Sequence, residues 1–127
     1  MIAALSAWHQ QHDAASAALQ EVDVLPAHVL IEAYSVLTRL PSGLAVLPAL
    51  AAEVLARRFA QPPLRLGDAE RGRILETLAD AGVLGGASYD GLIALEAKAH
   101  AHTLITLDER AQATYRRLGA EFTAIAD

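Results

Sequence analysis

Three acidic residues lie beside apolar segments, where a charged side chain is costly unless something compensates it. They are Glu32 within the segment 30–37, Asp90 within the segment 87–94, and Asp108 directly after the segment 103–107. Carboxylates that converge commonly share a divalent cation, because hard cations prefer oxygen ligands. The three residues therefore predict a site for a cation such as Mg²⁺ or Mn²⁺.

The elements that must position these side chains alternate between helix and strand signals, which favours an α/β layer fold. We expect helices over Ile2–Leu19, His28–Leu40, Pro48 to about Ala60, Ala69–Ala81, Ser88 to about His100, and Glu109–Leu118. We expect short strands over Val22–Leu25, Leu64–Leu66, Thr103–Leu107 and Glu121–Ile125. Asp68 and Ser88 look like N-caps of the helices that follow them. Short strands joined by helices favour a parallel sheet.

The carboxyl edge of such a sheet is where ligands of open α/β folds bind. Asp108 directly follows the strongest strand, so it lies at this edge. Asp90 falls in the first turn of its helix, and Glu32 falls in the first turns of a helix that follows a strand. All three side chains can therefore converge on one rim.

The length of 127 residues predicts a single domain over 1–127. The longest uncharged run, 40–52, is too short to span a bilayer and holds two prolines, so no membrane association is expected. Without cysteine there is no disulfide framework and no thiolate metal site, which favours a cytoplasmic location.

The net charge of −5 argues against nonspecific phosphate binding over the whole surface. Grouped arginines could still bind RNA locally, and the candidates are Arg57-Arg58, Arg71 with Arg73, and Arg116-Arg117. A solvated helix face is the favoured alternative for each pair.

The order and spacing of the acidic motifs resemble those of the PIN-domain ribonucleases, in particular the VapC-type toxins of bacterial toxin–antitoxin pairs. The motifs are residues 26–32 with 37–40, residues 88–94, and residues 103–111. The resemblance covers nearly all of the chain and implies a three-layer α/β/α fold with a mostly parallel central sheet. The family pattern has an early acid, a helix Glu, an Asp that opens a later helix and an Asp after a strand. The last three match Glu32, Asp90 and Asp108.

The chain departs from this pattern at its beginning. The family starts with a central strand that ends in an Asp, whereas residues 1–9 already look like the helix that follows such a strand. Asp13 and Asp23 do not replace the early acid, because neither follows a strand in the right register. The first central strand and its metal ligand therefore look absent from this sequence.

The resemblance implies a metal-dependent endoribonuclease toxin that cleaves tRNA, rRNA or mRNA and inhibits translation. It implies a cognate VapB-type antitoxin and a homodimer. Asp90 and Asp108 would be direct ligands of Mg²⁺ or Mn²⁺, and Glu32 would bind the ion directly or through water. The hydroxyl of Thr106 would orient a carboxylate or touch phosphate, and Ser88 would cap a helix or position substrate.

Other interpretations stay open at this point. A PIN-like shell that lacks its first acid could be catalytically impaired and bind only an antitoxin or RNA. Glu32 could be a partly exposed helix residue, Asp90 could favour the positive end of a helix, and Asp108 could be an N-cap. A receiver-like signalling domain is disfavoured, because Lys98 is the only lysine and is expected on a helix instead of a strand.

Overall fold

The structure, a computed structural model, describes residues 20–125. The chain forms two compact units, whose described parts are residues 20–63 and 64–125. The helix expected over Ile2–Leu19, and with it the expected absence of the family's opening strand, falls outside the described residues. A single domain over 1–127 stays a prediction. Within the described ranges, no helix is long and apolar enough to cross a membrane.

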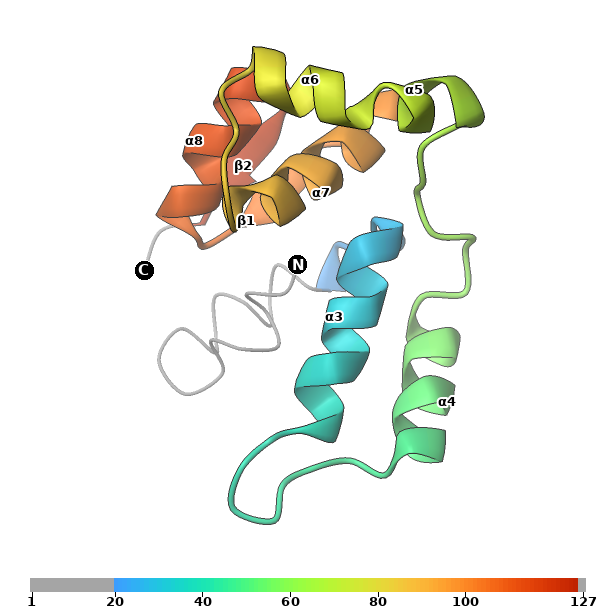
Figure 1. Ribbon diagram of the computed structural model, residues 1–127. Coiled ribbons are helices and arrows are strands. Elements are labelled where there is room, and N and C mark those ends of the chain that lie inside the picture. Colours follow the sequence, from blue (N-terminus) through green and yellow to red (C-terminus); the bar gives the residue numbers. More distant parts are fainter. Residues whose placement is uncertain (1–19, 126–127) are drawn as a thin grey trace. The chain divides into compact units, whose positions relative to one another are not determined.

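The first unit contains the helices α3 (Ala27–Thr38) and α4 (Pro48–Arg58), both close to the predicted ranges (Figure 1). Pro26 precedes α3 with φ −56° and ψ 145°, an extended conformation that keeps the helix from starting earlier. Pro48 is the first residue of α4, a position where its missing N–H group costs no hydrogen bond.

α3 and α4 pack against each other through small and branched side chains. The buried residues of the pair are Val29, Ala33, Ala51 and Leu55. Ala33 and Ala51 have no exposed surface, and their small size lets two helices approach closely. Four large apolar side chains of the two helices are nevertheless exposed, namely Ile31, Tyr34, Leu50 and Val54.

The second unit begins with two short helices where one was predicted. α5 (Asp68–Gly72) and α6 (Ile74–Asp80) are separated by Arg73, whose backbone has φ −112° and ψ 14°. The prediction of one helix over Ala69–Ala81 was wrong because Gly72 is a poor helix former next to the break. Asp68 is also not the N-cap, since Gly67 takes that position and Asp68 begins the helix.

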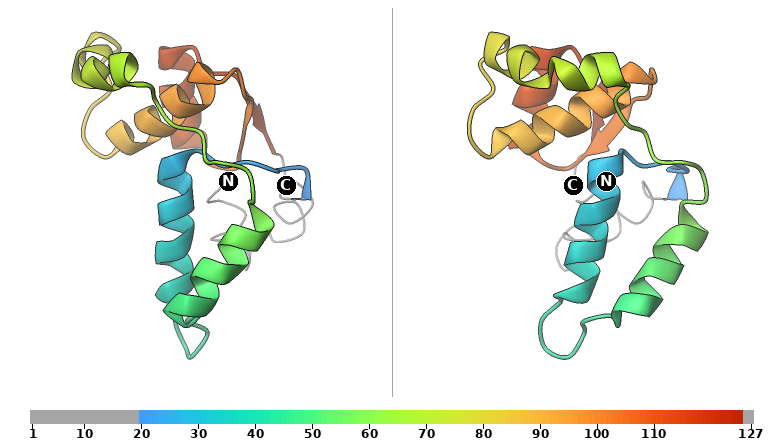
Figure 2. Two further views of the ribbon diagram at one scale, coloured as in Figure 1. Left: turned by 90° about the vertical axis from the view of Figure 1, so that its right-hand side faces the viewer. Right: turned by 45° about the vertical axis from the view of Figure 1, so that its right-hand side comes forward.

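The rest of the second unit is α7 (Ala87–Ala99), β1 (Leu104–Thr106), α8 (Glu109–Leu118) and β2 (Phe122–Ala124). β1 and β2 pair in parallel, with Leu104 opposite Phe122 and Thr106 opposite Ala124. α8 connects the strands and packs on both of them and on α7 (Figure 2). This arrangement confirms the predicted α/β class with a parallel sheet.

Two expected strands do not form. Residues 22–25 and 64–66 join no sheet with other strands in the part of the chain that the structure describes, where the sheet consists of β1 and β2. Leu64 and Leu66 are buried while Arg65 is exposed, so the alternation of a strand is kept. Pairing is limited to an isolated bridge at Leu64. The prediction failed because strand pairing depends on a partner segment that local sequence does not reveal.

Gly91 is a point of close packing inside the second unit. A Cβ atom added there would lie 2.6 Å from Leu78 Cδ2 and 3.5 Å from atoms of Val83 and Leu118. Gly91 therefore lets α7 approach α6 and α8 more closely than any side chain would allow.

Candidate functional site

Asp108 lies at the junction between β1 and α8. It is the N-cap of α8, and its Oδ1 accepts hydrogen bonds from the N–H groups of Arg110 at 2.9 Å and Ala111 at 3.5 Å. Oδ2 makes no hydrogen bond with the described part of the chain, and the residue is exposed. The carboxylate is thus fixed through one oxygen while the other is open to a ligand.

Thr106 holds the backbone that carries Asp108. Its side chain is buried, and its Oγ1 accepts a hydrogen bond from the N–H of Asp108 at 3.0 Å. Its carbonyl accepts the N–H of Ile125 at 2.9 Å, which ties the end of β1 to the segment after β2. The hydroxyl therefore orients the Asp108 backbone, not the carboxylate itself.

Asp90 lies in the first turn of α7, as predicted, and is half-buried. Ser88 is not the N-cap of α7, because that position belongs to Gly86. The N–H of Ser88 instead bonds the carbonyl of Gly85 at 3.0 Å. Gly85 has φ +55°, a turn conformation that glycine adopts without strain. After this turn the helix begins at Ala87, one residue earlier than predicted.

Asp90 lies at the start of α7, and Asp108 lies between the end of β1 and the start of α8. α7 leads into β1 through the short segment 100–103, so helix and strand run in opposite directions and the start of α7 lies where β1 ends (Figures 1 and 2). That the carboxylates of Asp90 and Asp108 meet at the carboxyl edge of the sheet stays a prediction.

Glu32 lies on α3 and has a partner that the sequence interpretation missed. Its Oε1 is 2.7 Å from Nε2 of His28, four residues earlier on the same helix. The two side chains are 37% and 23% exposed, so the pair is accessible to solvent. The spacing of four residues on a helix is the signal that could have revealed it.

Glu32 belongs to the first unit, whereas Asp90 and Asp108 belong to the second. The meeting of all three carboxylates therefore depends on how the units join, and it stays a prediction. Among residues 20–125, no group of three acidic or histidine side chains gathers closely enough to hold a metal ion. The donor chemistry still suits a hard cation, since every candidate ligand offers carboxylate oxygen.

His100 and His102 lie in the segment between α7 and β1. The ring of His100 is within 2.8 Å of the carbonyl of Arg65 through Nε2. This contact fixes the segment before α5 to the end of α7, so His100 has a structural role.

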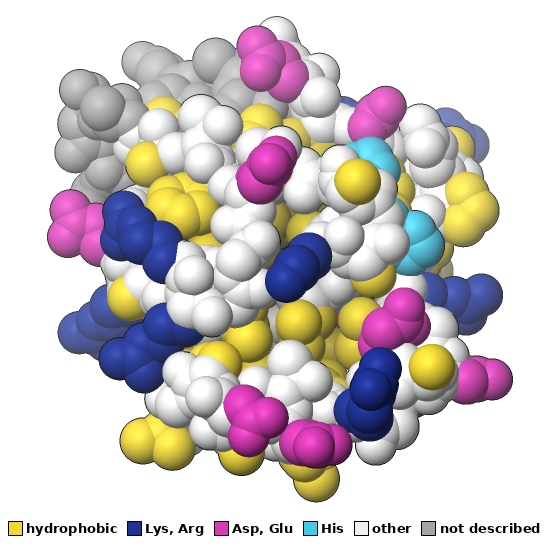
Figure 3. All heavy atoms as spheres, turned by 90° about the horizontal axis from the view of Figure 1, so that it is seen from above, with side chains coloured by type: hydrophobic (Ala, Val, Ile, Leu, Met, Phe, Trp, Pro, Cys, Tyr) yellow, Lys and Arg dark blue, Asp and Glu magenta, His cyan; other side chains and the backbone are white. Residues whose placement is uncertain are grey.

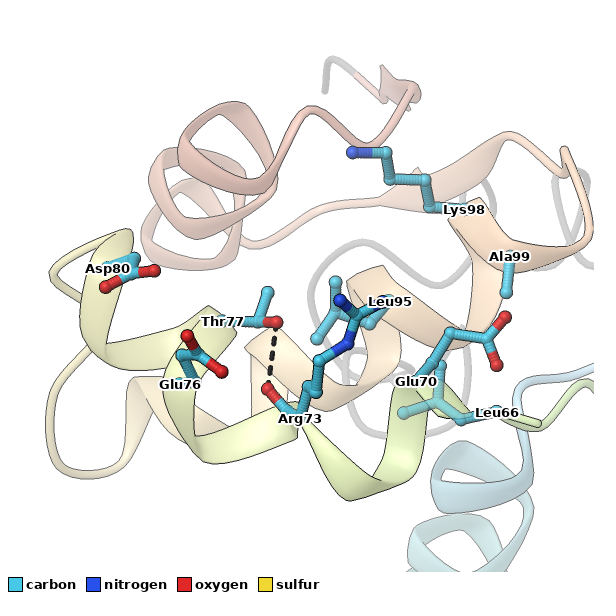
Figure 4. Close-up of a pocket in the computed structure, with 9 residues that line it drawn as sticks. All are labelled: Leu66, Glu70, Arg73, Glu76, Thr77, Asp80, Leu95, Lys98 and Ala99. Atoms are coloured by element: carbon cyan, nitrogen blue, oxygen red, sulfur yellow. Dashed lines mark hydrogen bonds between the residues drawn. The ribbon is translucent and has the colours of Figure 1, made fainter. Parts of the chain in front are cut away.

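A pocket of about 460 Å³ lies elsewhere on the second unit, between α5, α6 and α7 (Figure 4). Its lining includes Leu66, Glu70, Arg73, Glu76, Asp80 and Lys98. Nζ of Lys98 donates a hydrogen bond to the carbonyl of Leu118 at 3.0 Å, so this cation supports the end of α8. None of the predicted site residues lines the pocket, and the pocket is therefore separate from the predicted site.

Comparison with known proteins identifies the class. The sequence model of the PIN domain matches residues 1–117, so the chain belongs to the PIN-domain family. This membership confirms the three-layer α/β/α fold class, with which the parallel pairing of β1 and β2 agrees.

The chain is similar to VapC proteins within this family. It is 39% identical over 121 residues to Ribonuclease VapC40 of Mycobacterium tuberculosis, which covers 95% of this chain and 90% of the relative. It is 40% identical over 124 residues to Ribonuclease VapC27 of the same species, with 98% and 83% covered. These relatives confirm the predicted resemblance to VapC-type toxins. No solved structure matches the chain.

Proposed function

We propose that this protein is a metal-dependent endoribonuclease toxin that cleaves tRNA, rRNA or mRNA and thereby inhibits translation. The observation that carries the proposal is the geometry of Asp108, whose Oδ1 is fixed by α8 while Oδ2 is open beside the end of β1. Its PIN-domain membership and the ribonuclease names of its relatives support the same activity. The cytoplasm, where such RNA occurs, is the proposed location.

Asp90, Asp108 and Glu32 would hold one or two Mg²⁺ or Mn²⁺ ions. When bound, such an ion supplies an activated water and stabilises the charge that develops on the phosphate. Asp90 begins a helix and Asp108 follows a strand within the same unit, which supports their role as direct ligands. Glu32 would complete the set from the first unit.

The chain's own residues would orient this site. The N–H groups at the start of α8 hold Oδ1 of Asp108, and Thr106 holds its backbone, so Oδ2 keeps one direction. Gly91 lets the start of α7, which carries Asp90, pack closely on Leu78 of α6. Ser88 is half-buried and lies two residues before Asp90 on α7. Its hydroxyl would position substrate.

Large apolar side chains exposed on the first unit support a protein partner. They are Ile31, Tyr34, Leu44, Leu47, Leu50 and Val54. Ile31 is 67% exposed and Leu47 is 74% exposed, which is unusual for residues of this size. A cognate VapB-type antitoxin would place an amphipathic segment on this surface and restrain the toxin. A homodimer of this chain would use apolar surface of the same kind.

A second candidate is a catalytically impaired PIN-like domain that only binds an antitoxin or RNA. This candidate is favoured because no group of three possible metal ligands lies together among residues 20–125. The two candidates differ in one test, the cleavage of RNA by the purified chain with Mg²⁺ or Mn²⁺. The toxin enzyme predicts cleavage that Asp90→Asn abolishes. Cleavage that persists unchanged in Asp90→Asn would remove this residue from the mechanism, and binding without cleavage would favour the impaired domain.

A further inference from the structure

A planar cation lies on an aromatic ring at the surface of the second unit. The guanidinium carbon of Arg116 is 5.2 Å from the ring centroid of Phe122. The Phe122 ring packs in turn on Tyr115, with centroids 5.8 Å apart and planes tilted by 57°. Phe122 is also fixed in β2 opposite Leu104. Arg116 is exposed and Phe122 is half-buried, so the guanidinium is supported from below and open to solvent.

The helix that carries Arg116 is basic in an acidic protein. α8 contains three arginines and one glutamate, a net charge of +2, whereas the whole chain has −5. Arg and Lys side chains gather along the flank that carries α8 (Figure 3). Arg117 is already engaged, because it donates a hydrogen bond to the carbonyl of Gly82 at 2.9 Å. Arg110 makes no ion pair with the described residues and is exposed.

These features fit single-stranded nucleic acid. Unpaired bases stack on aromatic rings and on guanidinium planes, and arginine also pairs with phosphate. A duplex keeps its bases stacked on one another and cannot offer a face to such a platform. We propose that Arg116 supported by Phe122 binds a nucleotide of single-stranded RNA, and that Arg110 pairs with the phosphate backbone between this nucleotide and Asp108. This inference rests on the proposed ribonuclease function.

The position of the platform defines what it can do. Arg116 follows Asp108 by eight residues along one helix, which places it about 12 Å away along the helix axis. This separation is too long for contact with the phosphate that is cut at Asp108. The platform is therefore a positioning site for a flanking nucleotide, and its loss should raise KM and leave kcat nearly unchanged.

The test measures binding of a fluorescein-labelled single-stranded RNA of mixed sequence by anisotropy, in the full chain carrying Asp108→Asn to prevent cleavage. In this background, Arg116→Ala and Phe122→Leu should each weaken binding roughly tenfold. Arg116→Lys keeps the charge and should keep the dependence of binding on salt, while it loses part of the affinity. Arg71→Ala is the control, because it removes one exposed arginine from α5 of the same unit and should change affinity less than about twofold.

Cleavage by the chain with Asp108 intact gives the second measurement. A rise in KM with unchanged kcat in Arg116→Ala supports the platform. Equal affinity in Arg116→Ala and Arg71→Ala would overturn the platform while leaving the ribonuclease function in place. A parent chain that neither binds nor cleaves the RNA would overturn both. Arg116 is exposed, so its variants test the idea even if Phe122→Leu unfolds the protein.

Discussion

The hydroxyl oxygen of Thr106 accepts the backbone N–H of Asp108 at 3.0 Å, and Asp108 in turn caps α8. A buried residue at the end of a strand thus fixes an exposed carboxylate two residues later. This relationship explains how a three-residue strand can aim a candidate metal ligand. It also separates the structural role of Asp108 from its chemical role, because Oδ1 serves the helix and Oδ2 does not.

Substitutions at Asp108 should separate these two roles. Asp108→Asn keeps an oxygen that can cap the helix, so stability should change little, whereas RNA cleavage should be lost. Asp108→Ala should lose cleavage and also about 1 kcal/mol of stability. Urea unfolding and a cleavage assay measure the two effects. Full cleavage by Asp108→Asn would show that the carboxylate charge has no part in the chemistry.

Thr106→Val should remove the acceptor for the Asp108 N–H while keeping the size of the side chain. The part-buried N–H of Asp108 would then lose its partner, at a cost of about 1 kcal/mol. Cleavage should fall because the carboxylate loses its direction. Thr106→Ser restores the hydroxyl and should recover most of the activity. The control is Thr103→Val. Thr103 is exposed, and its hydroxyl makes a long hydrogen bond of 3.4 Å to a carboxylate oxygen of Glu121. Equal activity in the valine variants would remove Thr106 from the positioning role.

Gly91→Ala should destabilise the second unit. The gain from replacing glycine within a helix is about 1 kcal/mol, but the new Cβ meets Leu78 at 2.6 Å, and overpacking costs about 1–3 kcal/mol. We expect a net loss of about 1 kcal/mol, measured by urea unfolding. Gly72→Ala is the matched control, because nothing lies within 4 Å of its added Cβ. That variant should be stabilised by up to about 1 kcal/mol. Stabilisation of both variants would show that α6 and α7 are not closely packed at Gly91.

Glu32→Gln should lose function without losing much stability. Glu32 pairs with His28 at 2.7 Å, and Glu53 pairs with Arg57 at 2.6 Å, both at a spacing of four residues in the first unit. Glu53→Gln is the matched control. Each of the two substitutions removes one accessible helix pair, so each should lower the free energy of unfolding by less than about 0.5 kcal/mol. Only Glu32→Gln should abolish RNA cleavage and the rise in melting temperature on adding Mg²⁺. Identical behaviour of the two variants in both assays would exclude Glu32 from the metal site.

Local signals account for the parts of the fold that the sequence predicted well. The predicted range of α8, Glu109–Leu118, is the observed one, because Asp108 caps its start and Gly119 ends it with φ +72°. Non-local features account for the failures. The segments 22–25 and 64–66 have strand-like side chains, but a ladder needs a neighbour whose position only the folded chain supplies.

The candidate site divides in the same way. Asp90 opens α7 as predicted and Asp108 directly follows β1 as predicted, because both placements depend on local helix and strand signals. Their meeting at one edge stays a prediction. The convergence of Glu32 depends on packing between units, for which no local pattern gives a rule. The platform of Arg116 on Phe122 was missed because Arg116 lies on α8 and Phe122 on β2. The contact depends on how the chain turns between the helix and the strand.

Binding of Mn²⁺, followed by electron paramagnetic resonance of the free ion, tests most directly whether three carboxylates serve one cation. We predict that Glu32→Gln, Asp90→Asn and Asp108→Asn each weaken Mn²⁺ binding by roughly tenfold or more, while Glu53→Gln binds like the parent. Parental affinity in Glu32→Gln, beside a loss in the two aspartate variants, would contradict the shared site.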